Sequence, residues 1–108
     1  MRFEVLVDDV VVGWTELEGG DPPMGVALGR LHPNDAYADV KPGSSFRVRA
    51  GGGEFLEPSA GVHVEDYSAE LGADAIEISV LGLDSAIYEK YFTAHVRAYE
   101  DHWKSRDR

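Results

Sequence analysis

The sequence contains no cysteine among its 108 residues. This absence excludes disulfide bonds, zinc sites built on thiolates and catalysis by a cysteine nucleophile. The Gly-x-Ser-x-Gly elbow that presents the serine of many hydrolases is also missing. No run approaches the roughly 20 apolar residues that a membrane-spanning helix needs, and the first residues contain no apolar stretch of signal-peptide length. We therefore expect a cytoplasmic protein that is not an enzyme of these kinds.

Basic side chains are missing from residues 50–89, which hold nine carboxylates and neither lysine nor arginine. The acids are Glu54, Glu57, Glu65, Asp66, Glu70, Asp74, Glu77, Asp84 and Glu89. Because this stretch cannot neutralise itself, it predicts a surface with a strong negative field. Such a surface repels nucleic acid and anionic membranes, and it attracts basic proteins or cations. The whole chain has the same sign, with a net charge of −10.

The apolar content is that of a folded protein rather than of an acidic disordered tail. Hydrophobic residues make up 44% of the chain and aromatic residues 10%, which is enough to offset the entropy lost on ordering. A chain of this length buries roughly 60% of its unfolded surface. We expect a single domain over residues 1–108.

Runs of strand-forming residues predict an α+β fold with five to six short strands in a mostly antiparallel sheet. The runs are residues 3–7, 10–14, 24–31, 45–49, 62–67 and 75–81. Asp8-Asp9 separates the first two runs and has the length of a hairpin turn. Pro22 and Pro23 favour a loop over residues 18–23, and residues 33–40 favour one or two helical turns.

The last part of the chain is predicted to be one amphipathic helix. Residues 85–108 contain neither glycine nor proline, and the helix could start at Ser85 or at Thr93. Its apolar side chains recur at spacings of three to five: Ile87, Tyr91, Phe92, Val96, Tyr99 and Trp103. We expect this stripe to pack on the sheet.

Five of the ten bases fall in residues 90–108. They are suited to complement the dipole at the C-terminal end of the helix. A second role left open by the sequence is docking on the acidic surface of the same chain.

Four histidines are the obvious candidates for transition-metal ligands. His95 and His102 lie two helical turns apart, roughly 10 Å, which is too far for one zinc ion. His63 and Glu65 share one face of a predicted strand, and Asp66 follows them. These three residues define the alternative hypothesis of a small enzyme or a metal- or ligand-binding module. We nevertheless expect neither a metal nor a cofactor, because no two histidines have the spacing of four residues, as in His-x-x-x-His, that suits one zinc ion on a helix.

Trp14, Pro22, Pro23 and Met24 cluster in a segment that has little conformational entropy to lose. An exposed tryptophan beside a rigid loop is typical of a protein-binding surface. The alternative is that Trp14 and Met24 belong to the core and that the prolines only fix a turn.

The same segment resembles a group of small bacterial proteins generally described as uncharacterised. The resemblance rests on the pattern Gly-x-Thr-x-Leu-Glu followed by Asp-Pro-Pro-Met-Gly-x-Ala-x-Gly, which starts at Gly13 and includes residues 21–29. Val64-Glu65-Asp66-Tyr67 and Leu81-Gly82 belong to the same pattern. It covers about half of the chain and implies no activity or site residue. In size and charge alone, the chain is also similar to the immunity proteins that neutralise bacterial toxins.

The sequence thus favours a non-enzymatic protein-binding protein, either an immunity-type inhibitor or an adaptor, that presents an acidic face to a basic partner. The expected contact residues are Glu65, Asp66, Glu70, Asp74 and Glu77, with Trp14 and Tyr67 as aromatic anchors. A homodimer formed through the helix is a further alternative.

Overall fold

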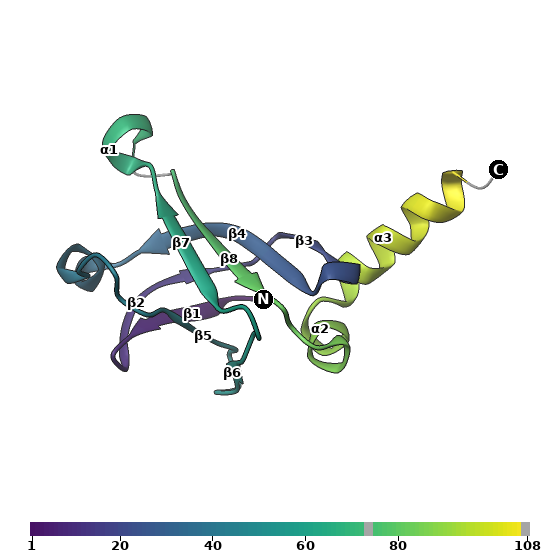
Figure 1. Cartoon of the computed structure of the whole chain (residues 1–108), viewed down its shortest axis with the longest axis horizontal. Coiled ribbons are helices and arrows are strands. Elements are labelled where there is room, and N and C mark those ends of the chain that lie inside the picture. The colour runs from purple at the N-terminus through teal and green to yellow at the C-terminus, as the bar shows by residue number, and fades with distance from the viewer. Residues whose placement is uncertain (73–74, 107–108) are drawn as a thin grey trace.

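The computed structural model describes residues 1–72 and 75–106, with side chains as far as Trp103. Within these residues the protein has an α+β fold. Eight strands form one antiparallel, strongly curled sheet with the shape of a half-barrel, and three α-helices and two 3-10 helices accompany it (Figure 1).

The strands are β1 (Phe3–Val7), β2 (Val10–Thr15), β3 (Gly19–Asp21), β4 (Val26–Pro33), β5 (Arg47–Arg49), β6 (Phe55–Leu56), β7 (Val62–Asp66) and β8 (Ile76–Leu81). The α-helices are α1 (Ser68–Leu71), α2 (Ser85–Tyr91) and α3 (Thr93–Arg106), and the 3-10 helices are η1 (Pro22–Met24) and η2 (Asp35–Asp39). The strand order is β6-β5-β1-β2-β4-β8-β7, and β3 also pairs with β4.

The predicted first hairpin is confirmed. β1 pairs with β2 in antiparallel register, and the two turn residues, Asp8 and Asp9, have φ angles of 50° and 65°. Positive φ at both central positions is the signature of a type I′ turn, whose twist matches that of the flanking strands. A register shift between Val5 and Leu6 marks a β-bulge, which bends the strand and adds to the curl of the sheet.

The other predicted strands are also confirmed, but the predicted number of strands is too low. The structure adds β3, which has the sequence Gly-Gly-Asp, and β6, which has two residues. Both are too short to show an alternating pattern. Residues 22–24 form a 3-10 turn instead of a loop, closed by Gly25 with a φ of 64°. The helical turn predicted over residues 33–40 is η2, which Asn34 caps by accepting a hydrogen bond from the Ala36 amide.

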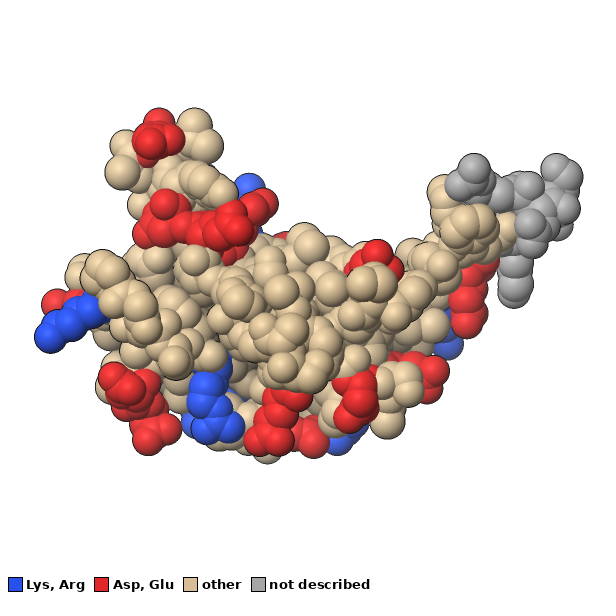
Figure 2. All heavy atoms as spheres, viewed as in Figure 1, with Lys and Arg blue, Asp and Glu red and all other residues tan. Residues whose placement is uncertain are grey.

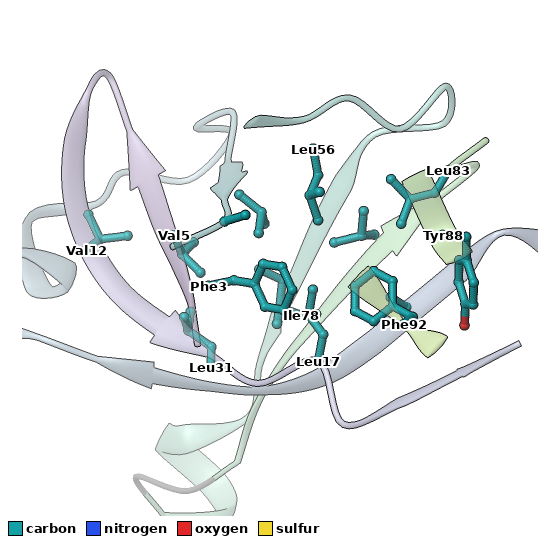
Figure 3. Packing of buried hydrophobic residues seen from close by; sticks show 14 of the residues in the cluster. Phe3, Val5, Val12, Leu17, Leu31, Leu56, Ile78, Leu83, Tyr88 and Phe92 are labelled. Carbon is teal, nitrogen blue, oxygen red and sulfur yellow. The ribbon is translucent and has the colours of Figure 1, made fainter. Parts of the chain in front are cut away.

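The hydrophobic core fills the concave side of the sheet (Figure 3). β8 supplies the clearest example of alternation, because Ile76, Ile78 and Val80 are buried and Glu77 between them is exposed. At one end of the core, Phe92 stacks on Phe3 with 5.5 Å between the ring centroids.

The C-terminal segment differs from its prediction in two ways. It forms two helices that break at Phe92, so the single continuous helix is wrong, although α3 begins at one of the two predicted starts. The aromatic stripe does not pack on the sheet along its whole length either. Tyr88 and Phe92 are buried, whereas Tyr99 and Trp103 are exposed by 37% and 45% because α3 points away from the body (Figure 1).

Among the described helices, none has both the length and the apolar character needed to cross a bilayer.

The Asp8-Asp9 turn yields a prediction about stability. Replacing it with Asn-Gly should raise the free energy of unfolding by about 0.5–1 kcal/mol, because Gly relieves the cost that an L-residue pays at positive φ. Urea unfolding measures the change, with Glu100→Gln/Asp101→Asn on exposed α3 as the control for removing two charges. A loss of stability in the Asn-Gly variant would contradict the turn assignment.

Candidate functional site

A groove of about 860 Å³ lies on the outer face of the sheet at the foot of α1. It is lined by residues of β4 and β8, by the segment between β2 and β3, and by Tyr67 and Leu71 at the two ends of α1. α1 rises beside it as a short projection, and acidic side chains gather on and around this projection (Figure 2).

Strand register sets the polar side of the groove. Glu77 of β8 lies directly opposite Arg30 of β4 on one side and Glu65 of β7 on the other. Directly opposed residues project from the same face of a sheet. Since Ile76 and Ile78 point into the core, this row of three charged residues projects outward.

The joint between β2 and β3 adds two further acids, Glu16 and Glu18. The Glu18 carboxylate accepts a hydrogen bond of 2.9 Å from the Arg30 amide, where a neighbouring strand would otherwise supply the acceptor. The Glu18 carboxylate fits beside this amide because the residue before Arg30 is glycine. A Cβ on Gly29 would overlap the carboxylate. The position of Glu18 is therefore fixed by the backbone of β4.

The groove also exposes apolar surface. Leu28, Tyr67 and Leu71 are exposed by 43%, 42% and 74%, and all three line it. Exposed apolar groups that gather in one place, with polar groups around them, are typical of interaction sites. Leu71 lies on α1 with most of its side chain in water, so it contributes little to the hydrophobic core.

Tyr67 links the apolar and acidic parts. Its hydroxyl donates a hydrogen bond to the Glu65 carboxylate. That bond, the negative charge of Glu65 and the more distant charge of Glu77 together raise the pKa of Tyr67. The hydroxyl therefore stays protonated and remains a donor at neutral pH.

The structure brings together only some of the residues predicted for partner binding. Tyr67 and Glu77 line the groove, and Glu65 stands beside them. Glu70 is exposed on α1, outside the lining. Asp74 lies outside the described residues.

Asp66 faces the other side of β7 from Glu65 and holds two structural contacts. Its carboxylate accepts hydrogen bonds of 2.8 Å from the Ser68 amide and from the Tyr37 hydroxyl. The bonds to Ser68, followed by the bond from Tyr37, lower the pKa of Asp66. Burial, then the bond to Asp66, raises the pKa of Tyr37 to about 12. Asp66 thus orders the start of α1 and ties η2 to β7.

Trp14 is half-buried on the outer face of β2, between two other side chains. The Arg2 guanidinium lies 3.8 Å from the indole centroid, and the His32 ring stacks on the indole with 4.0 Å between centroids. His32 lines the groove but Trp14 does not. Trp14 therefore supports one wall of the groove through His32 and does not project as an anchor.

The acidic stretch of residues 50–89 is only partly available to a partner. Glu54 pairs with Lys90 at 2.8 Å, and Glu57 approaches Arg47 at 3.8 Å. Asp84 caps α2 by accepting a hydrogen bond from the Ile87 amide. Glu65 and Glu77, at the groove, have no ion pair among the described residues.

Sequence reasoning missed Glu16, Glu18, Leu28 and Leu71. A signal for the first two was present, since Glu16 and Glu18 alternate with the buried Leu17 in the manner of a half-buried strand. No such signal existed for Leu28 and Leu71, because exposed and buried leucines look alike in a sequence.

The three residues of the alternative hypothesis, His63, Glu65 and Asp66, do not all lie on the same face of β7. The His63 ring nitrogen Nε2 donates to the Ala60 carbonyl at 2.9 Å. His63 and Glu65 share one face of β7, and Asp66 lies on the other. Across the part of the chain that the structure describes, no three His, Asp or Glu side chains are grouped so as to hold a metal ion.

Comparison with known proteins assigns neither a family nor a function to the chain. No protein-family model, curated protein or solved structure matches the chain.

The Asp66 contacts predict a pH dependence of stability. Since the pKa of Asp66 is lower in the folded state than in the unfolded chain, its contribution is present above the unfolded value and is lost as pH falls through the folded one. Asp66→Asn should therefore be less stable than the wild type at pH 7, and the difference should shrink on acidification below about pH 4. Urea unfolding across this range tests it, with Glu70→Gln as the control; a constant difference would contradict the role of the carboxylate.

The opposition of Glu65 and Glu77 predicts a gain in stability when one charge is removed. Like charges directly opposite each other in a sheet are destabilising. Glu65→Gln keeps an acceptor for the Tyr67 hydroxyl, so it should raise the melting temperature at low salt. The gain should decrease at high salt, where the repulsion is screened. Thermal unfolding at two salt concentrations measures it, and a destabilised Glu65→Gln protein would refute the repulsion.

Proposed function

We propose that the protein is a non-enzymatic binding protein whose groove at the foot of α1 takes a basic, partly apolar segment of another protein. The observation that carries the proposal is the exposure of Leu28, Tyr67 and Leu71 among fixed carboxylates. Apolar contact supplies binding energy, and the surrounding acids select for lysine and arginine.

The charges favour a protein partner over a nucleic acid. Among the described residues, the acids that line the groove are Glu16, Glu18 and Glu77, and the one arginine there is Arg30. Phosphates would be repelled there, since nucleic-acid affinity depends on lysine and arginine contacts. The net charge of −10 adds long-range attraction toward a basic surface.

An immunity-type inhibitor or an adaptor fits this surface. Carboxylates resemble phosphates in charge, so an acidic groove can compete for a basic cleft on a toxin domain, and steering raises the association rate. In this proposal Glu65, Glu77 and Tyr67 make the contacts, and Glu70 lies at the rim. Asp66 and Trp14 position the groove.

A synthetic amphipathic helical peptide of lysine and leucine is a suitable probe. We expect it to bind the wild type at low salt and to bind the double variant Glu65→Gln/Glu77→Gln about tenfold more weakly, because two exposed charges are lost. The matched control, Glu57→Gln/Glu100→Gln, removes the same charge far from the groove. Fluorescence anisotropy at about 50 and 500 mM salt measures both effects.

Two results would contradict the proposal. One is an equal loss of affinity in the groove variant and in the control, which would mean that only the overall charge matters. The other is equal binding of oligolysine of the same charge, together with no effect of Leu71→Ser. That result would remove the apolar contact from the site.

A further inference from the structure

The outer part of α3 projects from the body of the protein (Figure 1). The start of the helix is anchored to the body: the His95 ring nitrogen Nε2 donates to the Leu17 carbonyl at 2.8 Å, and Val96 packs against the core. Beyond this point the helix runs on to Arg106. Because short helices are marginal in water without packing, the projecting turns are expected to gain stability from contact with another surface.

The projecting turns carry an aromatic pair. Tyr99 and Trp103 meet edge to face with 6.0 Å between their centroids, and both are exposed by more than a third. The four-residue spacing places them on one helix face. This face is thus an exposed apolar surface separate from the groove at the foot of α1.

Charge is divided between these two parts of the chain. Residues 93–108 contain four bases and three acids, a net charge of +1, whereas residues 1–92 contain six bases and seventeen acids, a net charge of −11. The segment that includes α3 thus has a weak positive charge, opposite in sign to the acidic groove.

The two surfaces lie at opposite ends of the same side of the molecule. In Figure 1, α1 and α3 both rise from the upper side of the sheet, and Figure 2 shows a concave surface between them. A two-fold axis above this surface, along the line of view, would bring α3 of each copy to α1 of the other. Both copies then use the same two surfaces, and the assembly is a closed dimer to which no third copy can be added through these surfaces.

We propose that a second copy of this chain occupies the groove: the exposed face of α3 from each protomer packs on Leu28, Tyr67 and Leu71 of its partner in a two-fold dimer. This inference rests on the proposed function, because it uses the same groove. It adds that dimer formation and binding of a basic partner exclude each other. The free protein is then a dimer that masks its own site.

Sedimentation velocity over a range of protein concentrations at low salt tests the dimer. The groove variant is Leu28→Ser/Leu71→Ser, and the helix variant is Tyr99→Ser/Trp103→Ser. All four side chains are exposed, so the fold should survive, which circular dichroism checks. We expect each variant to raise the dimer dissociation constant about tenfold or more, and the control Val10→Ser, exposed on the first hairpin, to leave it unchanged.

Mixing the two variants identifies which surfaces meet. Each variant alone has no intact helix–groove contact, whereas the mixed dimer has one: the helix of the groove variant in the groove of the helix variant. We therefore expect the mixture to form heterodimers more tightly than either variant forms homodimers. A wild type that stays monomeric would overturn the inference. So would a groove variant that dimerises like the wild type, since this would place α3 against α3.

The peptide probe separates this inference from the proposed function. If the wild type is monomeric and still binds the lysine–leucine peptide through Glu65 and Glu77, the dimer alone is refuted. If the dimer forms through the groove and the helix variant binds no peptide, only the basic-partner proposal is refuted. If both hold, the helix variant should bind the peptide more tightly than the wild type does, because its groove is not occupied.

Discussion

The backbone at Leu17 is the constraint on which the sheet, the groove and the last helix all depend. Leu17 is fully buried, yet its φ is 47°, a conformation that costs a bulky L-residue free energy and persists only when its surroundings enforce it. The kink ends β2 and starts β3 along the same edge of β4. It turns Glu16 and Glu18 toward the groove, and it presents the Leu17 carbonyl to His95 at the start of α3. A regular strand here would remove both the acids and the anchor.

The residues at the groove lower the stability of the folded protein. Glu65 and Glu77 oppose each other across neighbouring strands, and Leu71 is exposed on a four-residue helix. Both arrangements are unfavourable in the free protein, because like charges repel and apolar surface orders water. A basic, apolar partner would relieve both at once. Surfaces that reduce stability in this way are frequent where selection acts on binding.

Much of the fold follows from the sequence because local patterns and tertiary packing agree. Residues 76–80 alternate as β8 requires, and the two aspartates tolerate the positive φ of the hairpin turn. The sequence could not predict β3, because Gly19 and Gly20 have no side chains to reveal a face. The projection of α3 was equally hidden, since Tyr99 and Trp103 have the same spacing whether they pack or not. The sequence placed Glu65, Glu77 and Tyr67 of the candidate groove in one acidic stretch, whereas Glu18 reaches the groove only through its bond to the Arg30 amide.

The two proposed occupants of the groove, α3 of a second copy and a basic partner, differ in charge. This difference determines which of them displaces the other. The segment of residues 93–108 has a net charge of only +1, so its attraction to the groove depends mainly on Tyr99 and Trp103. A strongly basic partner adds Coulombic attraction to similar apolar contact, and it meets the field of a dimer whose protomers each carry −10. Mass action then favours displacement of the helix as the partner accumulates. The weak positive charge of α3 therefore suits an occupant that protects an exposed apolar surface and yields to a more basic one.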